Sequence, residues 1–227
     1  MVKIGAVLSG CGFLDGSEIH ESVSTLLAIS RQGAAAVCMA PDAAQVEVIN
    51  YISGEPVKES RNILAESARI ARGKIQNIKN VKADDLDALI FPGGYGAAKN
   101  LCGFASKGLD CEVNPEVARL AREIHKAGKP IGAICIAPAL IAKIFQGSGF
   151  TLTIGNDRET AAAIENLGHT HQNCGVKETC VDRRSKIVTT PAYMYDANPA
   201  EIFVGIEKLV REVINLSSAF LDCHPER

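Results

Sequence analysis

The stretch KPIGAICIAPALIAK, from Lys129 to Lys143, decides the fold of this chain. Its first half is an apolar run of strand type that ends on a lone cysteine, Cys135, and small residues with a helical pattern follow at once. A cysteine in this position lies where a strand turns sharply into a helix, at the carboxyl edge of a sheet. Open α/β sheets bind ligands at that edge, and a helix N-terminus lowers the pKa of a thiol. The stretch therefore predicts an activated nucleophile.

Strand-like and helix-like stretches alternate on both sides of this segment. Helices are predicted over 17–32, from Asn114 to Gly128 and from Asn198 onward, and the last two open with Asn-Pro. Near-continuous apolar strands alternate with them, which predicts one doubly wound α/β domain over 1–227, with a mostly parallel sheet covered by helices on both faces. The strand-like runs are VKIGAVL (2–8), AAVCMA (35–40), DALIFPGG (87–94), KPIGAIC (129–135), TLTIG (151–155) and KIVTTP (186–191).

No composition shift, linker or internal repeat marks a domain boundary in the chain. The polar stretch from Asn50 to Lys58 is predicted to be an excursion from the sheet. The tail over 221–227 is predicted to be frayed.

Composition and charge indicate an ordinary globular protein, with 47% hydrophobic and 22% charged residues. A formal net charge of -2 gives no reason to expect nucleic acid or an acidic membrane as a partner. No window approaches the apolar run that a membrane span needs, and the N-terminal apolar segment is too short for a signal peptide. We therefore expect a cytoplasmic protein whose cysteines are reduced thiols.

Three segments converge at one sheet edge if the sheet is built this way, because each follows the carboxyl end of a strand. They are SGCGFLDGSEIHE (9–21), FPGGYGAAKN (91–100) and AICIAP (133–138). In the last of them, Cys135 would gain as a nucleophile from the helix dipole and from nearby backbone N–H groups, which favour the thiolate. The alternative is a cysteine simply packed at a strand end, and the local sequence leaves both open.

The other two segments carry candidate partners for the thiol. Gly93 and Gly94 let backbone N–H groups approach a ligand and hold a developing oxyanion, although a tight strand-to-helix turn would need the same glycines. Glu18 and Glu21 stand three residues apart, hence on one face of the first predicted helix. A carboxylate there could exchange a proton with the thiol or move one within a substrate. Complementarity to the helix N-terminus would explain acidic residues equally well.

Five longer strings follow one another along the chain: SGCGFLDGSEIHE, SRNILAESARIARGKI, FPGGYGAAKNL, GKPIGAICIAPAL and KIVTTPAYM. Together they resemble, over nearly the full length, the ElbB branch of the PfpI-like superfamily, which is related to class I glutamine amidotransferases. The resemblance implies a flavodoxin-like sandwich with Cys135 at the nucleophile elbow. It implies that the family's first-helix glutamate is Glu21, with Glu18 as the fallback, and that Gly94 and the amide of Ile136 are the oxyanion donors. Relatives are commonly dimeric, so a homodimer is expected.

Members of this branch are described as glutathione-independent glyoxalases and are linked by name to isoprenoid biosynthesis. Departures from the wider pattern favour that chemistry over amide hydrolysis: Ala137 replaces a glycine of amidotransferases and PfpI-type proteases, and Ile136 replaces the histidine of the proteases. Amide hydrolysis needs a proton for the leaving amine. Thiolate addition to an aldehyde, followed by proton transfer between adjacent carbons, needs only Cys135 and a carboxylate such as Glu21. We therefore predict a glyoxalase that converts small dicarbonyls to hydroxy acids.

Two other functions fit the same residues. Cys135 would also suit a non-enzymatic redox-sensing or stress-response protein, because a low-pKa thiol beside an acid is readily oxidised to sulfinic acid. Removal of sugar-derived adducts from proteins, as in a deglycase, would use the same thiol and acid, and the sequence does not separate it from glyoxalase activity.

No metal or other cofactor is predicted. His169, His171, Cys174 and Cys180 are ligand types at close spacing, but they match neither catalytic nor structural zinc patterns. The glycines after the first predicted strand resemble a dinucleotide fingerprint, yet the third of them, Gly16, comes one position too late for G-x-G-x-x-G.

Overall fold

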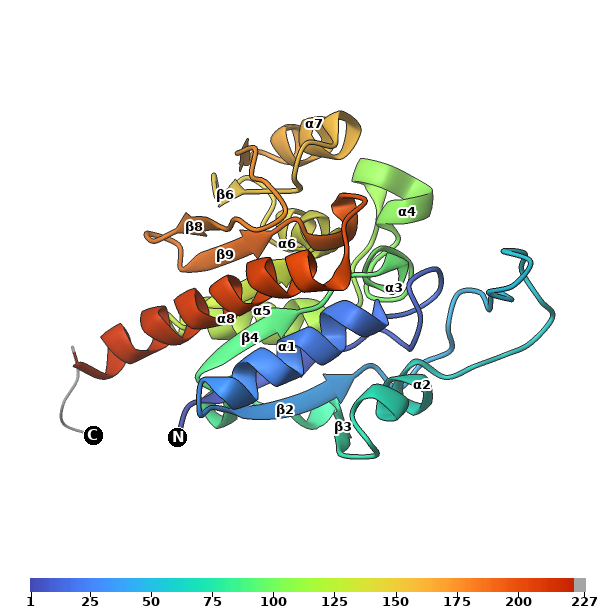
Figure 1. The fold of residues 1–227 in the computed structure, drawn as a ribbon, viewed down its shortest axis with the longest axis horizontal. Helices are drawn as coiled ribbons and strands as arrows, with labels where there is room; N and C mark the ends of the chain where they lie inside the picture. The colour runs from blue at the N-terminus through green and yellow to red at the C-terminus, as the bar shows by residue number, and fades with distance from the viewer. Residues whose placement is uncertain (223–227) are drawn as a thin grey trace.

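Seven strands form the main sheet in the computed structural model of this chain, which describes residues 1–222 (Figure 1). Every neighbouring pair is parallel except β8 and β9, which run antiparallel. The order along the sheet is β3-β2-β1-β4-β5-β9-β8. The strands are β1 (Lys3–Val7), β2 (Ala35–Ala40), β3 (Ile75–Asn77), β4 (Ala88–Phe91), β5 (Ile131–Ile134), β8 (Cys180–Asp182) and β9 (Ile187–Thr190).

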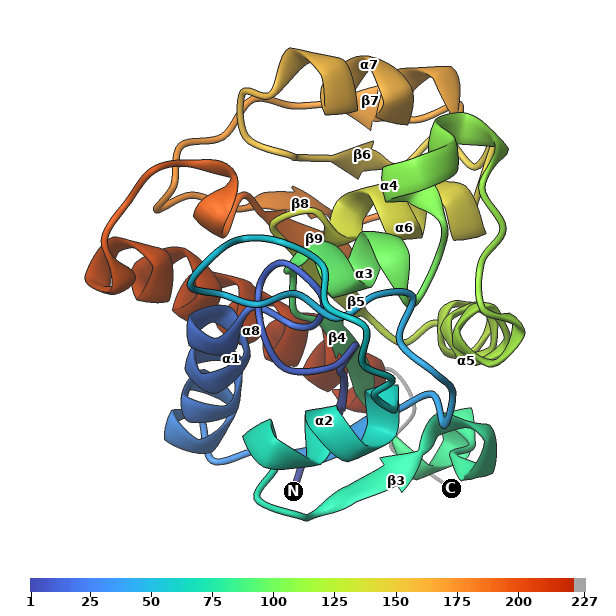
Figure 2. The same cartoon turned by 90° about the vertical axis from the view of Figure 1, so that its right-hand side faces the viewer.

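Helices cover both faces of this sheet, so the predicted doubly wound, flavodoxin-like α/β fold is confirmed. Figure 2 looks at one edge of the sheet and shows α1 and α8 on one side and α5 on the other. The helices are α1 (Ile19–Arg31), α2 (Ile63–Ile70), α3 (Tyr95–Lys99), α4 (Phe104–Lys107), α5 (Pro115–Lys126), α6 (Ala137–Ile144), α7 (Arg158–Asn166) and α8 (Pro199–Asp222). Short 3₁₀ turns are η1 (Ile78–Asn80), η2 (Ala83–Asp85), η3 (Gly108–Asp110) and η4 (Ala192–Met194).

The strands are buried on both faces, which explains why they appear in the sequence as apolar runs without alternation. In β4, Ala88 and Ile90 pack in the core under α1 and α8, while Leu89 and Phe91 pack in the opposite core with α5 and α6. All four residues are buried, as are the four residues of β5. Full burial of each large side chain among them, such as Ile90, Leu89 or Phe91, stabilises the fold by roughly 1.5 to 3 kcal/mol.

The topology brings four chain segments to one edge of the sheet. Strands β1, β4, β5 and β9 are consecutive neighbours and parallel, so their carboxyl ends lie side by side. The strand order reverses between β1 and β4, because the chain builds outward to β3 before it crosses back. Ligands of open α/β sheets bind in the crevice at such a reversal. The predicted convergence of segments is therefore realised.

Three local predictions need comment. The run 151–155 does form a strand, β6 (Thr151–Leu152), but it pairs with β7 (Thr170–His171) in a separate two-stranded sheet. The predicted excursion of residues 50–58 from the sheet is present and is longer than predicted, because the whole segment 41–62 leaves the sheet between β2 and α2. For the tail, α8 includes residues 221 and 222, and residues 223–227 lie outside the described part.

Candidate active site

Cys135 occupies the sharp turn between β5 and α6. Its φ of +60° is a left-handed conformation that a non-glycine residue adopts at a cost of roughly 1 to 2 kcal/mol. Its backbone N–H donates to Thr190 O at 3.0 Å, so the neighbouring strand β9 holds the turn in place. Only 7% of the residue is exposed. Backbone strain held by surrounding structure is a feature of functional sites.

Glu21 projects from the first turn of α1 against this cysteine. The side chain is completely buried, and it contacts the Cys135 thiol. Its Oε2 accepts the backbone N–H of Gly93 at 2.9 Å, and its Oε1 accepts that of Tyr193 at 3.2 Å. Burial, together with the nearby charge of Glu18, raises the pKa of Glu21 to about 8. The carboxyl group is therefore mostly protonated at pH 7.

The thiol is not acidified in the way that its place before a helix predicts. Burial and then the Glu21 charge raise the pKa of Cys135 well above its ordinary value, although the backbone N–H groups of Gly94 and Ile136 lower it. Protonation of Glu21 removes the repulsion between the two groups. The protonated carboxyl group can then donate a hydrogen bond to the sulfur, which stabilises the form of the pair that has a thiolate and a carboxylic acid and holds a single proton.

Glu18, the fallback candidate, has a different role in the structure. It is the N-cap of α1, and its Oε2 accepts the backbone N–H of Glu21 at 2.6 Å. Burial raises the pKa of Glu18, and its side chain lines the cavity in front of Cys135. Complementarity to the helix terminus thus accounts for Glu18, whereas the buried Glu21 is the carboxyl group that contacts the thiol.

In the glycine turn after β4, the backbone N–H groups of Gly93 and Gly94 have different partners. Gly93 was predicted to be an oxyanion donor. In the structure it donates its N–H to Glu21 and so holds the carboxyl group, which leaves this N–H unavailable to an oxyanion. Gly94 has a φ of +93°, and its N–H points toward the Cys135 sulfur, as does that of Ile136. The structure thus brings the amides of Gly94 and Ile136 together at the thiol.

Replacing Gly93 with alanine should destabilise the protein. The added Cβ would overlap the Cβ of Cys135 and lie 2.5 Å from Glu21 Oε2 and 2.8 Å from Ile134 O. Overpacking of this kind costs about 1 to 3 kcal/mol, and we expect that loss in chemical denaturation. Gly103→Ala is the matched control, because its Cβ would meet nothing closer than 3.6 Å and its φ is -93°. Equal stability of the two variants would contradict this packing.

Two residues near the thiol escaped the sequence analysis. Tyr193 lies just past the carboxyl end of β9, and its hydroxyl is 2.9 Å from Nδ1 of His20. Ala192, with a φ of +43°, turns the backbone so that Tyr193 N–H meets Glu21. The last residues of the string KIVTTPAYM, Pro191 to Met194, follow the strand β9 as the other three segments follow theirs, and that position was the available signal.

A cavity of about 780 Å³ opens in front of the thiol. Its wall combines Cys135 and Ile136 from the turn with residues of α3, α4, α7 and η4. Three carboxylates lie in this wall, and no lysine, arginine or histidine is among the described residues that line it. They are Glu18, Asp157 and Glu159.

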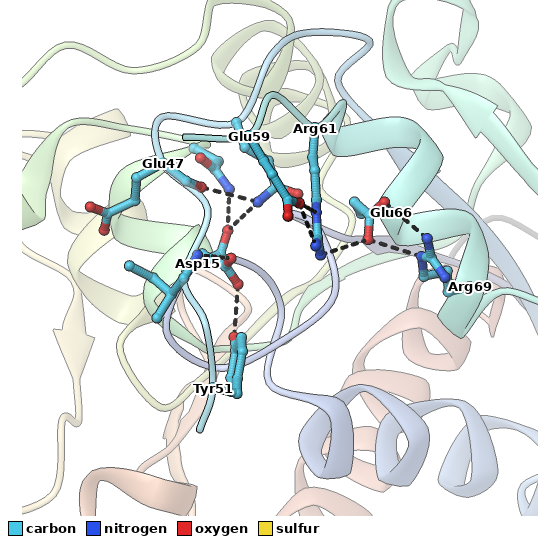
Figure 3. A network of polar contacts seen from close by, with 10 residues as sticks. Asp15, Glu47, Tyr51, Glu59, Arg61, Glu66 and Arg69 are labelled. Atoms are coloured by element: carbon cyan, nitrogen blue, oxygen red, sulfur yellow. Dashed lines mark hydrogen bonds and ion pairs between the residues drawn. The ribbon is translucent and has the colours of Figure 1, made fainter. Parts of the chain in front are cut away.

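A second polar network fixes the loop that borders the cavity (Figure 3). Asp15 is buried after β1, and its carboxylate accepts the Ile49 N–H at 2.9 Å and the Tyr51 hydroxyl at 2.7 Å. Asn100 donates to the carbonyl of Asp15 at 2.8 Å. The excursion over 41–62 is thereby fastened to the loop whose Phe13 lines the cavity.

The two histidines with the spacing of possible metal ligands have other contacts in the structure. His169 bonds Phe150 N and Ala142 O, and His171 accepts the Ile154 N–H. Within residues 1–222, no group of three or more His, Cys, Asp or Glu side chains is arranged to hold a metal ion. The described cysteines are all free thiols: Cys11, Cys38, Cys102, Cys111, Cys135, Cys174 and Cys180.

Comparison with known proteins assigns this chain to a family. A model of the DJ-1/PfpI family matches residues 13–191. The chain belongs to the DJ-1/PfpI family. Among its DJ-1/PfpI relatives, the mitochondrial ES1 protein homolog of Rattus norvegicus is 49% identical over 225 residues, which cover 95% of this chain and 84% of that protein. The mitochondrial glutamine amidotransferase-like class 1 domain-containing protein 3 of Homo sapiens is 48% identical, covering 95% and 83%.

A solved structure of this DJ-1/PfpI fold matches closely. The isoprenoid biosynthesis protein with an amidotransferase-like domain from Ehrlichia chaffeensis superimposes with a TM-score of 0.89 at 34% identity. The match covers 94% of this chain and 99% of that one.

The predicted cytoplasmic location is wrong by these comparisons, because both curated relatives are named as mitochondrial proteins. That prediction rested on the lack of a secretory signal, which leaves other compartments open. Among the described residues, no helix has the length and apolar character to cross a membrane.

Proposed function

We propose that this protein is a glutathione-independent glyoxalase of the ElbB branch, which converts dicarbonyls to hydroxy acids. The observation that carries the proposal is the Cys135–Glu21 pair: a thiol in contact with a buried carboxyl group whose pKa is raised to about 8. The 34% identity to the Ehrlichia chaffeensis protein supports the branch. The names of the curated relatives support a mitochondrial site of action. A homodimer stays a prediction.

The reaction begins when the thiolate of Cys135 attacks the aldehyde carbon of the substrate. The carbonyl electrons move to its oxygen, which the N–H groups of Gly94 and Ile136 stabilise. Glu21 gives this oxygen its proton, and a hemithioacetal results. The resulting Glu21 carboxylate is then the base for the next step.

In the second step, Glu21 removes the hydrogen of the former aldehyde carbon and returns it to the adjacent carbon. The intermediate is an enediol, so the second carbonyl oxygen must gain a proton, while the first oxygen loses one as the thioester forms. Water then attacks the thioester, Cys135 leaves as the thiolate, and the proton that the attacking water releases returns to Glu21. The net reaction consumes one water and yields a hydroxy acid, which ionises.

The test is a panel of dicarbonyls incubated with the protein in the absence of glutathione. Glyoxal, methylglyoxal and phenylglyoxal span a range of sizes that the cavity of about 780 Å³ admits, since pockets for much larger ligands have similar volumes. Identification of the hydroxy acids by mass spectrometry and NMR would support the function. Failure to convert any member would refute it.

The charge of the cavity wall predicts discrimination between substrates. We expect 4-carboxyphenylglyoxal to be converted about 10-fold less efficiently than phenylglyoxal, because Glu18, Asp157 and Glu159 repel an anion and each such pair costs about 1 kcal/mol or more. The cationic 4-trimethylammonio analogue should be converted at least as efficiently as phenylglyoxal. The variant Glu159→Gln should have a smaller difference in kcat/KM between 4-carboxyphenylglyoxal and phenylglyoxal than the wild type. Equal rates for the anionic and cationic analogues would show that the wall does not select by charge.

The redox-sensing alternative has less support. Oxidation and aldehyde addition both need the Cys135 thiolate, but only the glyoxalase reaction also uses the proton of the buried Glu21 carboxyl group. A deglycase would use the same pair of residues, and the dicarbonyl panel combined with a glycated peptide would distinguish the two.

A further inference from the structure

Tyr193 is tied to the candidate site through both its backbone and its side chain. Its N–H donates to Glu21 Oε1 at 3.2 Å, and its hydroxyl is 2.9 Å from Nδ1 of His20, where either atom can be the donor. The side chain also lines the cavity that contains Cys135. Tyr193 thus lies in the cavity wall, with its backbone on the Glu21 carboxyl group and its hydroxyl on His20.

The backbone at this point is held in an unfavourable conformation. Ala192 has a φ of +43°, a left-handed value rare for a residue with a side chain, and it follows Pro191 at the end of β9. Strain of this kind persists only where the surrounding structure enforces it. Its consequence here is to aim Tyr193 N–H at Glu21.

His20 connects the tyrosine to solvent. Its side chain is 59% exposed, and its Nδ1 lies 3.9 Å from Glu18 Oε1 as well as beside the Tyr193 hydroxyl. The two rings are 5.9 Å apart between centroids. An imidazole in this place can pass protons between bulk water and the Tyr193 hydroxyl.

We propose that the Tyr193 hydroxyl, reprotonated through His20, is the acid that protonates the second carbonyl oxygen of the dicarbonyl substrate. The inference rests on the proposed glyoxalase function and assigns the proton that its second step requires. When Glu21 removes the carbon-bound hydrogen, the electron pair forms the carbon–carbon double bond of the enediol. The second carbonyl oxygen then takes the Tyr193 proton.

The proton balance closes through His20. Tyr193 regains a proton from His20, which regains one from water, and the first substrate oxygen releases one to water as the thioester forms. No oxidant, reductant or further reactant is needed. The proton given by Tyr193 stays in the product as that of the hydroxyl group.

Other polar groups of the site have different tasks. The amides of Gly94 and Ile136 meet at the sulfur and serve the first oxygen, and Glu21 carries the carbon-bound hydrogen. Glu18 is held as the helix cap. Burial and the two nearby glutamates raise the pKa of Tyr193, which keeps its hydroxyl protonated and able to donate.

The first test is Tyr193→Phe, which leaves the backbone bond to Glu21 in place. We expect kcat/KM for phenylglyoxal to fall about 100-fold, with an unchanged rate of Cys135 alkylation by iodoacetamide. The kinetic isotope effect of aldehyde-deuterated phenylglyoxal should rise, because loss of the acid slows C–H cleavage alone. Tyr195→Phe is the matched control, since its hydroxyl bonds Cys174 O and lies outside the cavity wall.

The second test is His20→Ala. We expect kcat/KM to fall about 10-fold and added imidazole to restore it, while imidazole should leave Tyr193→Phe unchanged. Wild-type kcat/KM in Tyr193→Phe would overturn the role, and so would a loss with an unaltered isotope effect. A wild-type protein that converts no dicarbonyl would instead refute the proposed function, so the two failures are distinguishable.

Discussion

Replacing Cys135 with alanine is expected to lower kcat/KM for dicarbonyls by at least about 1000-fold, since loss of a nucleophile removes the covalent route entirely. Serine at this position should be equally inactive, because a hydroxyl group ionises far less readily than a thiol. The measurement is hydroxy-acid formation from phenylglyoxal by purified wild type and variants, with circular dichroism to verify folding.

Cys38→Ala provides the control for this result. Cys38 is also buried at a strand, but it packs in a separate core cluster with Ala6, Leu8 and Ile63. We expect full activity from that variant. Undiminished conversion by Cys135→Ala would rule out covalent catalysis at this residue.

Replacing Glu21 with glutamine is expected to lower kcat/KM by about 100- to 10,000-fold, the usual contribution of a positioned acid or base. Glutamine keeps the shape of the side chain but moves no proton. In the wild type, kcat/KM should rise with pH through about 8, as the Cys135–Glu21 pair loses one of its two protons. The variant should lack this rise. An active variant with the wild-type pH profile would contradict the role.

The same substitution has a second expected effect, on the pH dependence of stability. The pKa of Glu21 is about 8 in the folded protein against 4.5 ordinarily, so the folded state binds the extra proton between these values. Stability from this group is fully present below pH 4.5 and is lost as pH rises through about 8. At about 1.4 kcal/mol per unit of pKa, the loss amounts to about 5 kcal/mol.

Glu21→Gln should remove that loss. Glutamine offers one acceptor to the two N–H groups of Gly93 and Tyr193, which costs about 1 to 3 kcal/mol independently of pH. The informative quantity is therefore the slope of unfolding free energy between pH 5 and 8. A variant as pH-dependent as the wild type would mean that Glu21 is ionised throughout.

The sheet and the place of Cys135 could be predicted because each depends on a local pattern. Strands buried on both faces leave uninterrupted apolar runs, and a strand that ends on Cys135 before a helix needs no distant information. The run 151–155 has the same local pattern but pairs outside the main sheet. Periodicity does not reveal a strand's partner.

The site beyond the cysteine depends on geometry that residue types do not encode. Glu18 and Glu21 share a helical face, and only the cap hydrogen bond separates a helix-terminal residue from one buried against the thiol. The role of Gly93 depends on where its N–H points. Tyr193 was missed because the left-handed turn at Ala192 aims its backbone at Glu21.

The hydrogen bonds that connect β9 and the residues after it to the candidate site have a consequence for biosynthesis. Tyr193 and Glu21 are 172 residues apart, and β9 supplies the Thr190 carbonyl that holds the Cys135 turn. A chain emerging from the ribosome folds from its N-terminus, so Cys135 is translated well before the segment that encloses it. The Cys135 thiol therefore stays exposed to solvent until β9 and the residues after it pack against the rest of the sheet. Recovery of activity on refolding would therefore report completion of the fold, and chains truncated before Pro191 would carry a reactive, unshielded cysteine.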